Sequence, residues 1–171
     1  MQALMTRRSL VATTAVVAAG LRPAFGAGKN VAYLTPGLDL PFWRILAKGI
    51  GDEAKRNGGS SSAYDSHNSA QTQLQNAQDV IARRVDGIII SPTDSSTAPA
   101  VLAAAKRANI PVVIADIGTT SGEYVSFIIS DNFQGAYGIG QALGKAMHDK
   151  GWQNGTVGLV TISLARNNGQ A

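Results

Sequence analysis

Four short segments of this sequence mix carboxylates, hydroxyls and aromatic rings, and each comes shortly after a run of apolar residues. They are residues 39–43, 91–94, 116–118 and 130–132. Such a mixture suits a sugar, because ring C–H faces pack on flat aromatic side chains and an ionised Asp accepts two hydroxyl hydrogens at once. The residue types therefore indicate a sugar-like ligand.

Asp116 is the strongest candidate, since a carboxylate that ends a buried strand must be paired or must face a cleft. The other residues have simpler alternatives. Phe42 and Trp43, at the start of a helix, also fit ordinary core positions. Asp94 is typical of a turn residue, and Asp131 either caps the next helix or contacts the ligand.

The sequence offers no arrangement of side chains typical of catalysis. His67 and His148 are expected to be solvated surface residues, and no Ser/His/Asp set falls at strand ends in a usable arrangement. The chain has no Cys, which excludes disulfides, thiolate metal sites and a cysteine nucleophile. Gly138-Ile139-Gly140 lies inside a helical pattern and not in the turn that a dinucleotide needs. We expect a binding protein, not an enzyme, with no cofactor and no metal.

The residues between the polar segments predict alternating strands and helices. Two apolar runs, 87–90 and 112–115, lack polar alternation, as a strand covered by helices on both faces requires. They favour a parallel sheet. The strands are expected at Asn30–Thr35, Ser61–Tyr64, Gly87–Ser91, Pro111–Asp116, Tyr124–Ile129 and Thr156–Ile162.

Four helices are expected between these strands. The first begins near Pro41, the second follows a capping Asn68, the third begins at 95–97 and the fourth covers about 133–150. This alternation predicts a doubly wound α/β fold, in which ligands bind at the carboxyl ends of the strands. The predicted apolar faces are Phe42, Ile45, Leu46, Gly49 and Ile50 in the first helix and Leu74, Ala77 and Ile81 in the second.

The positive charge of the chain is concentrated at its N-terminus. The formal net charge is +4, but three arginines lie within the first 26 residues, which contain no acid. Without these three, 12 of the 15 Lys and Arg residues remain against 11 acids, a balance of about +1. No basic run longer than two residues remains, so nucleic-acid binding is not expected.

Residues 1–26 predict an export signal peptide. Arg7-Arg8 precedes an apolar run from Leu10 to Leu21, and small residues stand at Ala24 and Gly26, before a cleavage site. The segment 6–10 is also typical of a twin-arginine signal. The run of roughly 12 apolar residues is shorter than the ~20 that a membrane-spanning helix needs. We expect a periplasmic protein without a membrane anchor.

Several motifs follow one another in order after residue 30. They are Pro41-Phe42-Trp43, Gly58-Gly59, Asp65 with Asn68, the run from Val85 to Asp94, the run from Ala108 to Val113, and Ser130-Asp131-Asn132. This order resembles the first lobe of type I periplasmic binding proteins, in the ribose-binding cluster. The resemblance implies a first lobe at residues 27–130 and an incomplete start of a second lobe at 131–171.

The resemblance also implies a ligand site between two lobes. Leu40 and Ile117 differ from the ribose-type pattern, which has a polar amide and an arginine there. Two hydrogen-bonding groups are thus missing, which points away from ribose itself and toward a different small polar ligand. By position, the first-lobe contacts are Asp39, Phe42, Trp43, Ser91 and Asp116, the crossing between lobes carries Ser130, Asp131 and Asn132, and Arg166 is similar to a second-lobe arginine that contacts the ligand.

In this family two lobes close on the ligand, and a membrane partner recognises the closed form. The resemblance implies delivery of a monosaccharide or similar compound to an ABC transporter, or alternatively to a membrane sensor or chemoreceptor. A transcription regulator of the lactose-repressor type shares the fold, but it needs a helix-turn-helix where this sequence has an export signal. Because the second lobe is incomplete, we expect a partial sequence that binds its ligand weakly.

Overall fold

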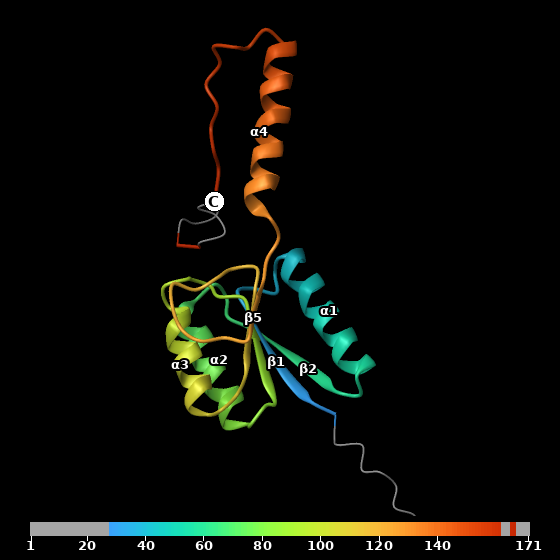
Figure 1. The fold of residues 1–171 in the computed structure, drawn as a ribbon, viewed down its shortest axis with the longest axis vertical. Coiled ribbons are helices and arrows are strands. Elements are labelled where there is room, and N and C mark those ends of the chain that lie inside the picture. Colours follow the sequence, from blue (N-terminus) through green and yellow to red (C-terminus); the bar gives the residue numbers. More distant parts are fainter. Residues whose placement is uncertain (1–27, 162–164, 167–171) are drawn as a thin grey trace, which may run out of the picture.

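The computed structural model describes residues 28–161 and 165–166, so the predicted signal peptide lies outside the described residues. Figure 1 shows a sheet flanked by helices, with one helix standing apart from it. The elements are β1 (Asn30–Thr35), α1 (Pro41–Arg56), β2 (Ser60–Asp65), α2 (Ala70–Ala82), β3 (Gly87–Ile90), α3 (Ala98–Arg107), β4 (Val112–Ala115), β5 (Ser126–Ile128) and α4 (Asn132–Asp149).

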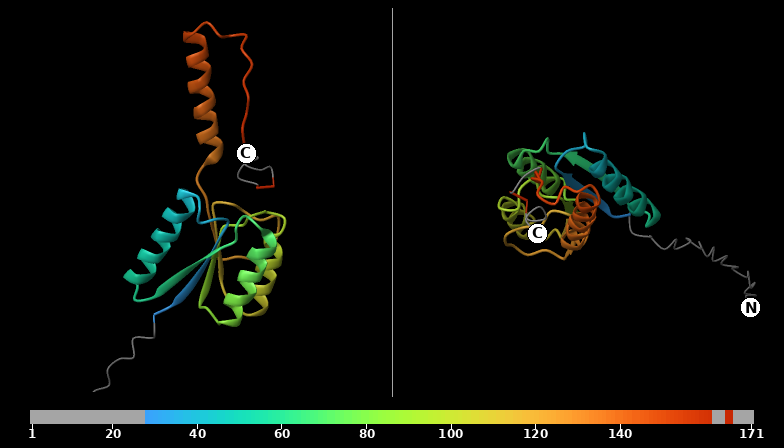
Figure 2. Two further views of the ribbon diagram at one scale, coloured as in Figure 1. Left: turned by 180° about the vertical axis from the view of Figure 1, so that it is seen from behind. Right: turned by 90° about the horizontal axis from the view of Figure 1, so that it is seen from above.

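All strand pairs in the sheet are parallel, and the strand order is β2-β1-β3-β4-β5. Helices α2 and α3 cover one face and α1 covers part of the other (Figures 1 and 2). Placement on two faces follows from the right-handed crossover rule, because the chain runs in opposite directions across the sheet from β1 to β2 and from β2 to β3. The predicted doubly wound α/β fold is confirmed.

The hydrophobic core lies between the sheet and the pair α2 and α3. Alternate strand residues point into it, and small apolar residues of the two helices let the backbones approach. Its buried members are Ala32, Leu34, Ile88, Ile90, Val112 and Ile114 from the strands, and Ala77, Val80, Val85, Val101, Leu102 and Ala105 from α2, α3 and the turn after α2. Leu74 and Ile81, predicted as buried, are partly exposed at its border.

The Gly58-Gly59 motif lies in the turn between the end of α1 and the start of β2. Gly58 has φ +73°, a left-handed conformation that glycine adopts without steric cost. A Cβ on Gly59 would lie 2.3 Å from the carbonyl oxygen of Lys29, so only glycine lets β2 start this close to β1. The two residues therefore serve the turn and not the ligand.

Two predictions for local structure are wrong. The N-cap of α2 is Ser69, whose hydroxyl accepts a hydrogen bond from the main-chain N–H of Thr72, and not Asn68, which has a left-handed φ of 54°. Residues 156–161 of the predicted strand Thr156–Ile162 have no regular structure. A strand needs a hydrogen-bonded neighbour, and no described strand lies next to this segment.

Helix α4 differs from the other helices in its surroundings. The carboxylate of Asp131 caps it by accepting a hydrogen bond from the N–H of Gln134 at 2.9 Å. In the part of the chain that the structure describes, no residue of α4 is buried. The helix extends beyond the carboxyl edge of the sheet, away from α1, α2 and α3 (Figures 1 and 2).

Candidate ligand-binding site

A small cavity opens at the carboxyl edge of the sheet, where α1 begins and β4 and β5 end. Its volume is about 210 Å³, below the roughly 300 Å³ at which ligand pockets usually begin. Three of the predicted ligand residues meet there, although they are far apart in the sequence. The lining residues are Phe42, Leu46, Ala115, Asp116, Ile128, Ile129 and Ser130.

Asp116 projects from the end of β4. Its main-chain N–H donates a hydrogen bond of 2.8 Å to the carbonyl oxygen of Ile128, which fixes it to the last residue of β5. Its φ of 66° is uncommon for a residue with a Cβ, and such strain is often found at functional sites. The backbone of Asp116 is thus fixed at the cavity that this residue lines.

Phe42 and Trp43 have different environments despite being adjacent. Trp43 is 4% exposed and belongs to the core, whereas Phe42 is 54% exposed and lines the cavity. Their rings pack edge to face with centroids 4.7 Å apart. Of the two alternatives left by the sequence, the core position applies to Trp43, and Trp43 in turn supports the ring of Phe42.

Ser91 is fully buried and does not line the cavity. Its hydroxyl lies 3.0 Å from the hydroxyl of Tyr33, and burial raises the pKa of this tyrosine despite the hydrogen bond. The contact therefore joins β1 to the residue that directly follows β3.

Gln73 fixes the loop that follows β3, and sequence reasoning missed it. Its side-chain amide donates to the carbonyl oxygen of Ser91 at 2.9 Å and accepts from the N–H of Thr93 at 3.0 Å. The signal that could have found it is the spacing 73, 77, 80 on α2, which places it on the buried face with Ala77 and Val80.

The loop before α1 is held by Asp65, at the end of β2. Its carboxylate accepts hydrogen bonds from the main-chain N–H groups of Leu38 (2.9 Å) and His67 (2.7 Å). Partial burial opposes ionisation, but these N–H groups outweigh it and leave the pKa of Asp65 below its usual range. Asp39 itself is exposed, and its carbonyl oxygen accepts a hydrogen bond of 2.7 Å from Arg44.

Arg166 lies against the loops that follow β2 and β3. Its guanidinium donates to the side-chain oxygen of Asn68 at 2.7 Å and to the carbonyl oxygen of Thr93 at 3.3 Å, and the residue is 8% exposed. Burial lowers the pKa of Arg166, and the negative charge of Asp116 opposes that shift. The predicted cation and the predicted carboxylate therefore sit within electrostatic reach of each other.

The three polar residues after β5 have separate positions. Ser130 lines the cavity, Asp131 caps α4, and Asn132 is the first residue of that helix. Of these three residues, only Ser130 thus contributes directly to the cavity.

Asp94 forms a turn, as the sequence indicated, by accepting hydrogen bonds from the N–H and hydroxyl of Ser96.

Within residues 28–161 and 165–166, no three acidic or histidine side chains gather where they could hold a metal ion. No helix in these same ranges is long and apolar enough to cross a membrane. The cavity itself is lined by one carboxylate, one hydroxyl and one aromatic ring, and a guanidinium lies within electrostatic reach of the carboxylate. This set can bind a small polar ligand through hydrogen bonds and ring packing.

The chain thus forms a parallel, doubly wound α/β lobe with a cavity beyond its strand ends, where proteins of this fold class bind ligands. The chain belongs to the type I periplasmic binding proteins: a family described as "Periplasmic binding protein domain" matches residues 31–171. The predicted family is confirmed.

The chain is similar to known sugar-binding proteins. It is 33% identical to the ribose import binding protein of Escherichia coli K12 over 170 residues, which cover 99% of this chain and 56% of that protein. A glucose-bound transporter solute-binding protein of Clostridium phytofermentans has a TM-score of 0.73 at 21% identity, covering 83% of this chain and 44% of that one. The arabinofuranose-bound binding protein of Shewanella sp. ANA-3 has a TM-score of 0.65 at 28% identity, covering 70% and 41%.

These relatives are sugar-binding transport proteins and not enzymes, which confirms the expectation of a binding protein. The chain spans about half the length of the curated relatives that it matches, 56% for the ribose import binding protein.

Proposed function

We propose that this chain forms part of a periplasmic protein that binds a small sugar-like ligand for delivery to an ABC transporter. The observation that carries the proposal is the convergence of Asp116, Phe42 and Ser130 on one cavity at the carboxyl edge. Asp116 accepts ligand hydroxyl hydrogens, and the exposed ring of Phe42 packs against the sugar ring. The likeness to sugar import proteins supports this assignment.

The remaining predicted residues act around this cavity. Asp39, Ser91, Asp131, Asn132 and the buried Trp43 position loops or border the site, and Arg166 approaches Asp116 from the chain beyond α4. Residues 27–130 form the first lobe and residues 131–171 begin a second one. Leu40 and Ile117 are apolar and donate no side-chain hydrogen bond, which supports a less hydroxylated or different small polar ligand in place of ribose.

Affinity measurements with a sugar panel test the ligand site. The 171-residue chain is titrated calorimetrically with ribose, apiose, arabinose, glucose and myo-inositol. Asp116→Asn should lower the affinity for the best ligand at least about tenfold, because a charged hydrogen-bond acceptor is lost. Asp79→Asn, an exposed carboxylate on α2, is the matched control. Equal affinity in the parent and the Asp116 variant would remove this carboxylate from the site.

Export through residues 1–26 is the second part of the proposal. A fusion of residues 1–30 to a reporter that is active only outside the cytoplasm should give activity. Replacing both Arg7 and Arg8 by Lys should abolish it if the twin-arginine route is used. Unchanged activity in this double variant would exclude that route, and an inactive parent fusion would contradict export altogether.

A further inference from the structure

Residues 165 and 166 are bound to two loops at the carboxyl edge by three hydrogen bonds. The N–H of Ser95 donates to the carbonyl oxygen of Ala165 at 3.1 Å. The guanidinium of Arg166 donates from Nε to the carbonyl oxygen of Thr93 and from Nη2 to Oδ1 of Asn68. Arg166 lies 98 positions after Asn68 and 73 after Thr93, so these contacts are not local. They determine where the positive charge of Arg166 stands.

Both acceptors of the guanidinium are uncharged. An amide oxygen and a main-chain carbonyl oxygen satisfy N–H donors of a buried arginine without neutralising its charge. The negative charge of Asp116 acts on this cation, because it raises the pKa of Arg166 against the lowering that burial causes. Asn68 and Thr93 therefore hold the cation in place within reach of the carboxylate that lines the cavity.

The loop that carries Asn68 is anchored by contacts of its own. Asn68 has φ 54° and the preceding His67 has φ 47°, a left-handed conformation that Asn tolerates better than most residues. The N–H of Asn68 donates to the carbonyl oxygen of Pro36 at 2.6 Å, and the side-chain amide of Asn76 donates to the carbonyl oxygen of Asp65 at 3.0 Å. These bonds tie the loop to the ends of β1 and β2 and to α2, so Oδ1 of Asn68 comes from an anchored backbone.

The carbonyl oxygen of Thr93 belongs to a loop that is fixed in the same way. Gln73 bonds to Ser91 and to Thr93, and the N–H of Ser91 donates to the carbonyl oxygen of Leu34 at 2.9 Å. Pro92, between Ser91 and Thr93, is fully buried. Two anchored acceptors from separate loops therefore meet at the guanidinium of Arg166.

The chemistry of the pair explains why the orientation of Arg166 matters. A carboxylate accepts hydrogen bonds and a guanidinium donates them, whereas a sugar hydroxyl does both. A ligand hydroxyl can therefore bridge Asp116 and Arg166 when the guanidinium is held in a fixed direction. An untethered arginine side chain would lose rotamer freedom on binding, and that loss would weaken the affinity.

We propose that Asn68 is a positioning residue, which together with the carbonyl oxygen of Thr93 docks the guanidinium of Arg166 and orients it toward Asp116 and the ligand. The effect on the ligand rests on the proposed function, whereas the docking contact does not. Because residues 131–171 begin a second lobe in the proposed function, the contact also joins the two lobes without a ligand and favours their closed arrangement.

NMR of the chain with nitrogen-labelled arginine tests the docking contact without a ligand. Arg166→Lys identifies the Nε–H signal of Arg166 by removing it. Asn68→Gly accepts the left-handed backbone but has no acceptor, so it should shift this signal and speed its exchange with water. Asn68→Asp keeps an acceptor and should retain slow exchange.

His67→Gly is the matched control for this measurement, because His67 shares the left-handed backbone and its side chain is 78% exposed. It should leave the Arg166 signal in place, and circular dichroism establishes that each variant keeps the parent's fold. An Arg166 signal that Asn68→Gly leaves unchanged, or that His67→Gly changes equally, would overturn the docking contact.

Calorimetry tests the effect on the ligand, using the compound that binds best among ribose, apiose, arabinose, glucose and myo-inositol. Asn68→Gly should lower its affinity about tenfold, the scale of one hydrogen bond to a charged group. In the Arg166→Gln background the same substitution should change the affinity less than about twofold, because its partner is already gone.

An equal loss in both backgrounds would show that Asn68 acts without Arg166 and would overturn the positioning role. A parent chain that binds none of the five compounds would contradict the proposed function and with it the effect on the ligand. The NMR signal would still decide the docking contact, so the two failures are distinguishable.

Discussion

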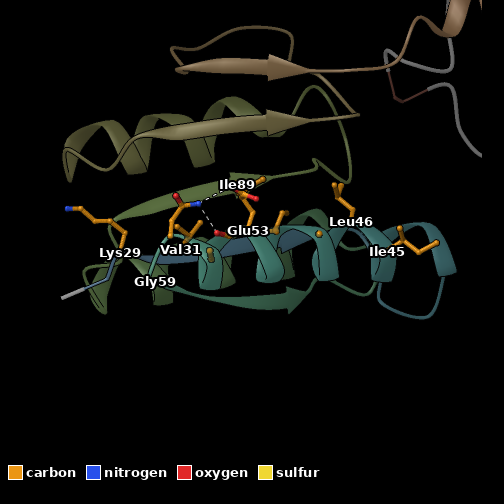
Figure 3. Close-up of a pocket in the computed structure, with 11 residues that line it drawn as sticks. Lys29, Val31, Ile45, Leu46, Glu53, Gly59 and Ile89 are labelled. Atoms are coloured by element: carbon orange, nitrogen blue, oxygen red, sulfur yellow. Dashed lines mark hydrogen bonds between the residues drawn. The ribbon is translucent and has the colours of Figure 1, made fainter. Parts of the chain in front are cut away.

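The two faces of the sheet contain similar apolar strand residues but differ in how completely helices cover them. On the face under α2 and α3, Ile88, Ile90 and Ile114 are almost inaccessible to solvent. On the face under α1, Ile89 and Val113 remain partly exposed, and a groove of about 630 Å³ lies beside them (Figure 3). Strand residues in a parallel sheet are apolar on both sides because helices usually cover both faces of such a sheet. The comparison shows that the face under α2 and α3 supplies the packed core, while the face under α1 is only partly covered by the described residues.

The largest expected effect is a difference in unfolding free energy between substitutions at two neighbouring residues, Ile90 on the covered face and Ile89 on the open face. Ile90→Ala should lower the free energy of unfolding by about 2–5 kcal/mol, because it opens a cavity in a fully packed region. Ile89→Ala removes the same atoms on the open face and should cost about 1 kcal/mol. Urea unfolding at one fixed protein concentration measures both values. Equal costs would mean that the open face is covered in solution.

Sequence reasoning predicted the order of strands and helices well, since continuous apolar runs and Pro, Gly and Asn signals are local. It placed β1 at Asn30–Thr35 as observed and began α1 at Pro41 as observed. It could not predict that the apolar side of α1 stays partly exposed. Periodicity places Ile45 and Ile50 on one side of the helix, but it does not show which residues cover that side.

The site was predicted in part for the same reason. The strand-end position of Asp116 follows from local pattern, and so does its place at the carboxyl edge. The buried role of Trp43 beside an exposed Phe42 depends on contacts distant in sequence, as does the link from Gln73 to the loop after β3. The strand expected at 156–162 failed because a strand depends on a neighbour and not on its own sequence alone.

The next effect in size concerns the polar contacts that tie the covered face to the carboxyl edge. Gln73→Leu should lower the free energy of unfolding by about 1–3 kcal/mol, because a buried carbonyl and a buried N–H lose their partner. Gln75→Leu, on the exposed side of α2, should stay within about 0.5 kcal/mol of the parent. Thermal or urea unfolding of the two variants measures the difference, and similar stabilities would show that the loop after β3 does not need this contact.

The smallest expected effect concerns the N-terminal caps of two helices: α2, which packs on the covered face, and α4, which extends from the sheet. Ser69 caps α2 and Asp131 caps α4 through the same kind of hydrogen bond, to the third residue onward, at 3.2 and 2.9 Å. Removing either side chain should weaken its helix by about 1 kcal/mol. In Ser69→Ala this loss should appear in the global free energy of unfolding, because α2 unfolds together with the core. In Asp131→Ala the global free energy of unfolding should not change, because no residue of α4 is buried in the described part of the chain and the helix should open locally. Hydrogen exchange should instead be faster in the first turns of α4. A lower global stability in the Asp131 variant would show that α4 packs on the body of its own chain, and the contrast between the covered and open parts of the molecule would then be wrong for this helix.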